Sequence, residues 1–252
     1  MGVVILQNFQ EAAEIIKKSQ HITVFTGAGI SVESGIPPFR GEDGLWEKYD
    51  PYFLHINYFM NNPKESWQLN KKLFYSMFED CQPNQAHEVV AKLEKESYVD
   101  TVITQNIDNL HQKAGSKKVY EFHGTYKELI CTECGKIYGF KPEYLKELPP
   151  RCEKCNGILK PNFIFFGEGI PQKAYQASIK EAETADVFIV IGTTGEVTPA
   201  SLIPDMASRH GAKIIEVNTD YSNFTNNITD VFLKGKATEM MQKLYSKLKE
   251  IE

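Results

Sequence analysis

The sequence predicts an α/β fold: a parallel sheet with helices on both faces, which carries a smaller module formed by two insertions. Short apolar runs typical of buried strands alternate along the chain with segments of helical spacing. A glycine-rich turn follows the first of these runs, as at the start of nucleotide-binding βα units. Two stretches interrupt the alternation, one crowded with aromatic residues and one containing four paired cysteines.

The elements of the sheet are assigned in chain order. Residues Phe9–Gln20 have apolar side chains at helical spacing, and the apolar run Ile22–Phe25 that follows is the first buried strand. Further strands are expected at 99–104, 119–122, 187–192 and 214–218, and helices at 86–95, 172–185 and 200–210. A parallel sheet is expected because helices separate most of these strands.

The interrupting stretches divide the chain into two expected domains. Residues 44–80 and 126–159 are predicted to pack together as the small domain, with a helical aromatic-rich part and a four-cysteine part. Residues 1–43, 81–125 and 160–252 are predicted to form the larger sheet domain. A chain of 252 residues is long enough for this arrangement.

Composition excludes several classes of protein. The net charge of −5 argues against direct nucleic-acid binding by the chain as a whole. No apolar run approaches the roughly 20 residues of a membrane span, and the N-terminus lacks the pattern of a signal peptide. A cytoplasmic location is therefore expected. The oligomeric state is not determined by these features.

The four paired cysteines predict a structural zinc site. Cys131 and Cys134 enclose two residues, as do Cys152 and Cys155, and 17 residues separate the pairs. Four thiolates complete a tetrahedral shell, so the ion is expected to hold the fold together without taking part in chemistry. A zinc ribbon that binds nucleic acid is the alternative, although glutamates offset the lysines around the cysteines. The remaining Cys81 receives no role.

The glycine turn Gly27-Ala28-Gly29 is by itself a weak indication of a dinucleotide site. Glycine lets a backbone approach a pyrophosphate at a helix start. The third glycine of the usual fingerprint is missing here, so a plain βα turn explains the motif equally well.

Several motifs taken together are far more specific. They read GAGISVESGIPPFRG from Gly27, TQNIDNLHQKAG from Thr104, His-Gly at His123, Phe-Gly-Glu at Phe166, and GTTGEVTPA from Gly192. In this order around a four-cysteine module, they closely resemble the sirtuin family of NAD-dependent protein lysine deacylases. The resemblance extends from about residue 22 to residue 237. It implies a Rossmann-like NAD-binding domain, a small zinc domain, and an acyl-lysine peptide as the partner.

The resemblance also implies the roles of individual residues. His123 is expected to accept a proton from a ribose hydroxyl, and Asn106 and Asp108 are the other expected catalytic residues. NAD is expected to contact Gly27, Ala28, Gly29, Phe39, Arg40, Gln105, Asn106, Ile107, Asp108, Gly192, Thr193, Thr194, Asn218 and the backbone near Ala237. The peptide is expected to contact Ile164, Phe166, Gly167, Glu168, Glu196 and Val197.

Alternatives remain for several of these residues. A lone histidine at a strand end is more often structural than catalytic, and Asn106 and Asp108 are also good helix caps.

The expected products are nicotinamide, free lysine and O-acyl-ADP-ribose. Protein mono-ADP-ribosyl transfer at the same NAD site is the alternative activity, and a non-catalytic binding module is a second.

The acyl preference follows from a departure from part of the family. Members that remove succinyl or malonyl groups carry a Tyr-x-x-Arg motif, and Asn70 and Leu73 stand at the corresponding positions. The stretch from Gly41 to Pro150 contains no arginine, so a bidentate clamp for a carboxylate is absent. Acetyl and longer apolar acyl groups are therefore expected. Lys160 stands where the family often has arginine.

Overall fold

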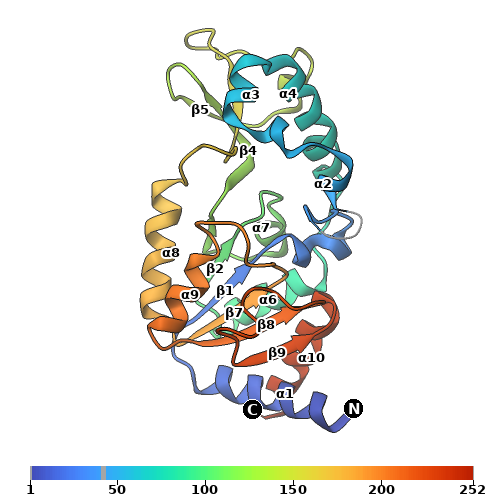
Figure 1. The fold of residues 1–252 in the computed structure, drawn as a ribbon, viewed down its shortest axis with the longest axis vertical. Coiled ribbons are helices and arrows are strands. Elements are labelled where there is room, and N and C mark those ends of the chain that lie inside the picture. The colour runs from blue at the N-terminus through green and yellow to red at the C-terminus, as the bar shows by residue number, and fades with distance from the viewer. Residues whose placement is uncertain (1, 41–43, 252) are drawn as a thin grey trace.

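A parallel six-stranded sheet is the main element of the computed structural model, which describes residues 2–40 and 44–251 (Figure 1). The strand order is β3-β2-β1-β7-β8-β9, so the order reverses between β1 and β7. The predicted sheet is confirmed. Its strands are β1 Ile22–Thr26, β2 Thr101–Thr104, β3 Val119–Glu121, β7 Val187–Ile191, β8 Lys213–Asn218 and β9 Val231–Lys234.

Helices cover both faces of this sheet, as predicted. On one face, α1 (Gly2–Lys18), α6 (Gln85–Lys95) and α10 (Ala237–Glu250) share an apolar core with the strands. On the other face, α8 (Gln172–Thr184) and α9 (Leu202–Arg209) pack against a second core. Alternate residues of a strand enter the two cores, so strands buried on both faces have uninterrupted apolar sequences.

Some elements differ from the expectation. The first helix begins at Gly2 and not at Phe9. The helix after the glycine turn, η1 (Ala28–Ser34), is a 3₁₀ helix. Strand β9 and helix α10 were not predicted. Strand β9 has the sequence Val-Phe-Leu-Lys with alternating burial, and three apolar residues followed by an exposed lysine are too short a run to stand out as a buried strand.

The two insertions pack against each other as a smaller unit, at the top of Figure 1. Trp67 Nε1 donates a hydrogen bond of 2.7 Å to the carbonyl of Leu159, and the rings of Tyr75 and Tyr126 meet edge to face. The first insertion contains α2 Leu45–Lys48, η2 Pro51–Leu54, α3 Ile56–Asn61, α4 Pro63–Asn70, the π-helical η3 Lys71–Tyr75 and α5 Ser76–Phe78. The second contains η4 Pro142–Leu145 and β5 Ile137–Gly139. Its antiparallel sheet is completed by β4 Gly124–Cys131 and β6 Leu159–Phe163, which extend beyond the predicted limits of the insertion.

The domain limits given above remain a prediction, and their ends at residues 1, 43 and 252 lie outside the described residues, as does Gly41 of the first motif. Among the described residues, no helix combines the length and the apolar character needed to cross a membrane. The loops that follow β1, β2 and β7 face the smaller unit, and the short helix α7 (Leu110–Ala114) follows the loop after β2.

Candidate active site and metal centre

The loops that follow β1 and β7 interlock where the strand order reverses. The N–H of Gly27 donates to the carbonyl of Ile191 at 2.9 Å, and the N–H of Gly29 donates to the carbonyl of Gly192 at 2.8 Å. A Cβ on Gly29 would lie 2.6 Å from the Cα of Gly192, whose φ of +63° favours glycine. The glycines are therefore required for the two loops to approach each other, whatever else they bind.

A cleft of about 930 Å³ lies between the sheet and the smaller unit. It is where ligands are expected in a sheet of this topology, beyond the carboxyl ends of the strands at the reversal point. Residues predicted for the cofactor and residues predicted for the peptide line it together. They are Phe39, Arg40, Gln105 and Ile107 from the first group, Ile164, Phe166, Gly167, Glu168 and Val197 from the second, and His123.

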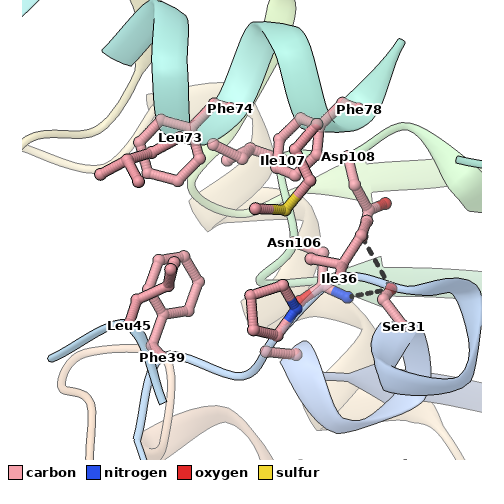
Figure 2. Close-up of a pocket in the computed structure, with 13 residues that line it drawn as sticks. Ser31, Ile36, Phe39, Leu45, Leu73, Phe74, Phe78, Asn106, Ile107 and Asp108 are labelled. Carbon is pink, nitrogen blue, oxygen red and sulfur yellow. Dashed lines mark hydrogen bonds between the residues drawn. The ribbon is translucent and has the colours of Figure 1, made fainter. Parts of the chain in front are cut away.

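A second pocket, of about 330 Å³, adjoins this cleft through Phe39, Phe74 and Ile107, which line both. Figure 2 shows its two sides. Asn106, Asp108 and Ser31 form a polar side, while Phe39, Leu45, Leu73 and Phe74 form an apolar one.

The polar side is a hydrogen-bonded network of buried groups. Asn106 Nδ2 donates to the carbonyl of Gly27 at 3.1 Å and to Ser31 Oγ at 3.2 Å. Ser31 Oγ donates to Asp108 Oδ2 at 2.7 Å, and Asp108 Oδ1 accepts from the N–H of Leu110 at 2.9 Å. Asp108 therefore also binds the N–H of Leu110, the first residue of α7. Burial raises the pKa of Asp108 above its ordinary value, although both hydrogen bonds lower it.

The imidazole of His123 is held in one orientation at the end of β3. Its Nδ1 lies 3.0 Å from the carbonyl oxygen of Gln105, which can only accept, so Nδ1 carries the hydrogen and Nε2 is left as an acceptor. Burial lowers the pKa of His123, and the Gln105 bond opposes this shift. The side chain is thus a neutral imidazole with a free acceptor nitrogen at neutral pH, as a general base requires.

Residues predicted to contact the adenosine end of the cofactor are connected by hydrogen bonds to Gln105, whose carbonyl holds His123. Gln105 Nε2 donates to Thr193 Oγ1 at 3.0 Å, and Asn218 Nδ2 donates to the carbonyl of Thr193 at 2.9 Å. The expectation at Ala237 concerns its backbone, and its side chain belongs to the apolar core under α10. The backbone just before Ala237 lies beside Asn218, because the N–H of Gly235 donates to the carbonyl of Asn218.

The predicted peptide-binding residues come from two facing segments. The backbone of Phe166 is already paired, since its N–H donates to Leu54 and its carbonyl accepts from Ile56. The residue is 44% exposed, so Phe166 remains accessible. On the other segment Glu196 is exposed, and its carboxylate lies 3.5 Å from Arg40 Nε.

Lys160 and Glu168 hold the first of these segments in place. The buried Lys160 Nζ donates to the carbonyls of Pro161 and Phe163, each at 2.8 Å, and lies 3.0 Å from Glu168 Oε2. The same carboxylate oxygen accepts from the N–H of Phe165 at 2.7 Å. Burial lowers the pKa of Lys160, while the Glu168 carboxylate opposes that shift. The side chain of Glu168 is therefore part of the scaffold.

The four cysteines converge on one point in the smaller unit. Their sulfur atoms all lie within 4.8 Å of one another, with 3.5 Å between Cys131 and Cys155 and 3.7 Å between Cys134 and Cys152. These separations suit a tetrahedral ion with sulfur ligands at about 2.3 Å. Tyr138 Oη lies 3.1 Å from Cys152 Sγ, as a hydroxyl that supports a thiolate ligand would.

Comparison with known proteins decides the family. The model of the Sir2 family matches residues 27–199. The NAD-dependent protein deacylase 2 of Archaeoglobus fulgidus is 44% identical over 247 residues, 96% of each chain. The chain belongs to the Sir2 family. The NAD-dependent protein deacetylase 1 of Pyrobaculum aerophilum is 42% identical over 241 residues, 95% of this chain and 94% of the relative.

Solved Sir2 structures share the whole fold. One, reported on the mechanism and regulation of Sir2 enzymes, has a TM-score of 0.90 and 43% identity, and covers 98% of this chain and 99% of its own. A complex of a Sir2 protein with a p53 peptide and NAD⁺ has a TM-score of 0.88 and 35% identity, and covers 96% of this chain and 98% of its own. The sirtuin resemblance of the sequence is confirmed.

Two buried polar residues of this Sir2 site, Ser31 and His87, were not predicted from the sequence. Ser31 links Asn106 to Asp108, and His87 lies behind it, with 3.4 Å between Ser31 Oγ and His87 Nε2. The centroids of the His87 and His111 rings lie 5.0 Å apart, and His87 is fully buried. The capping pattern of Asn84 and His87 at the start of α6 could have indicated this inward orientation.

Proposed function

We propose that this Sir2-family protein is an NAD-dependent protein lysine deacylase that yields nicotinamide, free lysine and O-acyl-ADP-ribose. One observation carries the proposal: His123 lines the same cleft as the predicted cofactor and peptide residues, with an acceptor nitrogen available. The activities named for the relatives at 42–44% identity support it.

The residues present suit NAD. The pocket beside the cleft has a polar side of Asn106 and Asp108 and an apolar side formed partly by Phe39, which suits a flat ring bearing an amide. Thr193 and Asn218, joined by a hydrogen bond, would hold the adenosine end. NAD would supply an electrophilic ribose carbon with nicotinamide as its leaving group.

The protein's side chains would then orient the reactants and move one proton. His123 Nε2 would accept a proton from a ribose hydroxyl, with the Gln105 carbonyl holding the ring in place. Asn106 and Asp108 would present fixed polar groups, because Ser31 and Gly27 restrict them. Phe39 and Trp46, packed at 5.2 Å between ring centroids, would help to exclude water from the cleft.

The four cysteines would hold Zn²⁺ as a structural ion. A complete shell of thiolates leaves no position for water or substrate, so no step of the reaction needs the metal. Reduced thiols of this kind require a reducing compartment, which supports the cytoplasmic location we also propose.

The acyl pocket is proposed to take apolar groups. Leu73 is apolar, and Asn70 is buried with its amide donating to the Ser66 carbonyl at 2.7 Å. Neither side chain offers the charge that a succinyl carboxylate would need. Aromatic side chains line the larger cleft, in which the acyl-lysine would lie, among them Phe74, Phe163 and Phe165.

Acyl-lysine peptides, assayed with and without NAD and analysed by mass spectrometry, test the proposal. Acetyl and longer apolar acyl peptides should give O-acyl-ADP-ribose and nicotinamide, and a matched succinyl peptide should react more slowly. ADP-ribosylated protein in place of acyl-ADP-ribose would instead establish the transferase activity. Faster removal of succinyl than of acetyl would contradict the apolar pocket.

A further inference from the structure

Glu216 is a fully buried acid whose partners lie in a single loop. It stands in β8, on the sheet face that packs against α8 and α9, and has 0% exposure. Ser222 Oγ donates to its Oε1 at 2.6 Å, and Thr229 Oγ1 donates to its Oε2 at 2.7 Å. Burial of a carboxyl group among apolar side chains is costly, so a specific reason for this residue is expected.

The two hydroxyls tie down both ends of the loop between β8 and β9. Ser222 lies near the start of residues 219–230 and Thr229 near their end. A connection of this length without a regular helix or strand loses considerable chain entropy when it is ordered. The carboxyl group of Glu216 therefore fixes a loop that would otherwise have many conformations.

The middle of this loop supports the segment Gly192–Val197. The backbone N–H of Asn223 donates to the carbonyl of Thr194 at 3.0 Å, and Asn223 Nδ2 donates to the carbonyl of Gly195 at 3.2 Å. Beneath them, the Phe224 ring lies so close that a Cβ on Gly195 would be 2.9 Å from it. The loop thus sets the backbone of the segment through hydrogen bonds and packing.

That segment carries predicted contacts of both ligands. Thr193 and Thr194 are the residues proposed for the adenosine end of NAD, and Glu196 and Val197 are those proposed for the peptide. Since the two sets are adjacent in the chain, a displacement of Gly195 moves both.

We propose that Glu216 is a positioning residue that couples NAD binding to peptide binding, through the loop 219–230 and the segment Gly192–Val197. It touches neither ligand and acts only by fixing the loop. The inference rests on the proposed function for its kinetic consequences, while its structural part can be tested without ligands.

The test compares Glu216→Val with Glu216→Gln and with a control on the same face of the same strand, Ile214→Val. The valine variant leaves Ser222 and Thr229 without their acceptor, whereas glutamine keeps an acceptor oxygen. Loss of two positioning hydrogen bonds should raise the KM for NAD and the KM for acetyl-peptide together, each by about tenfold, with kcat little changed. Glutamine should restore most of the affinity, and Ile214→Val should lower the melting temperature without changing either KM.

Hydrogen exchange provides the readout that does not depend on activity. In Glu216→Val, the amides of residues 192–197 and 219–230 should exchange faster, while those of β3 and β4 stay protected. A valine variant that melts earlier but keeps both KM values would reduce Glu216 to a merely structural residue, and a rise in only one KM would refute the coupling. If the wild-type protein releases no nicotinamide, the proposed function fails, and the exchange data still decide whether Glu216 positions the segment.

Discussion

Replacing His87 by glutamine tests whether a buried neutral imidazole behind the proposed nicotinamide pocket sets the acid stability of the protein. His87 has 0% exposure, and burial lowers its pKa from 6.5 to about 4. Because the folded-state pKa is depressed, the folded protein keeps this ring neutral at a pH where the unfolded chain binds a proton. Stability is therefore present above the unfolded pKa and is lost as the pH falls toward the folded one.

The size of the effect follows from these two pKa values. Between about pH 7.5 and about pH 5.5, proton uptake at this position in the unfolded state lowers the free energy of unfolding by roughly 1.3 kcal/mol. The loss approaches about 3 kcal/mol once both states are protonated. His111 is buried beside it and adds a loss in the same direction, which the His87 variant retains.

Urea unfolding at the two pH values measures the difference. The wild-type protein should lose about 1.3 kcal/mol more stability than His87→Gln on acidification, whatever the absolute stabilities are. Zinc content should be measured in each sample, because thiolate protonation acts on both proteins alike. Equal losses in the two proteins would show that the imidazole is not held neutral, and the electrostatic description of the network would be wrong.

Substitutions in the cysteine cluster and at Lys160 test the scaffold. Cys131→Ser or Cys155→Ser should abolish stoichiometric zinc binding and loosen the smaller unit, lowering the melting temperature and, indirectly, deacylation. Cys81→Ser, outside the cluster, is the control and should keep its zinc; a zinc-free cluster variant with normal melting would overturn the structural role. Lys160→Met should cost about 3 kcal/mol in urea unfolding, because it leaves Glu168 without its charged partner, whereas Lys160→Arg should cost less. An undiminished stability of the methionine variant would mean that this ion pair does not hold the segment Phe163–Glu168.

The central strands of the sheet could be predicted from the sequence because each of them is buried on both faces. Runs such as Val187–Ile191 are apolar throughout, as strands covered by helices on both faces of a sheet are. The edge strand β9 has one partner and alternating exposure, so its pattern is not distinctive. Helix α10 is amphipathic, and the sequence reading did not assign its pattern.

Contacts between segments that are distant in the chain could not be predicted from the sequence. The cysteine spacing indicates a metal centre because the ligands and their chemistry are local to two turns. Ser31 and Glu216 give no such signal, since a buried polar side chain and a solvated one look alike until the partner is known. Gly29, in the first motif, is required because it packs closely against Gly192. The local sequence pattern around Gly29 does not indicate this contact.

The most direct test of the proposed function is the turnover of His123→Ala with NAD and an acetyl-lysine peptide. If His123 Nε2 accepts the ribose proton, formation of O-acyl-ADP-ribose should fall at least about a hundredfold, with zinc content and melting temperature unchanged. Wild-type turnover in a folded, zinc-loaded His123→Ala protein would contradict the proposal that the cleft is organised around this imidazole.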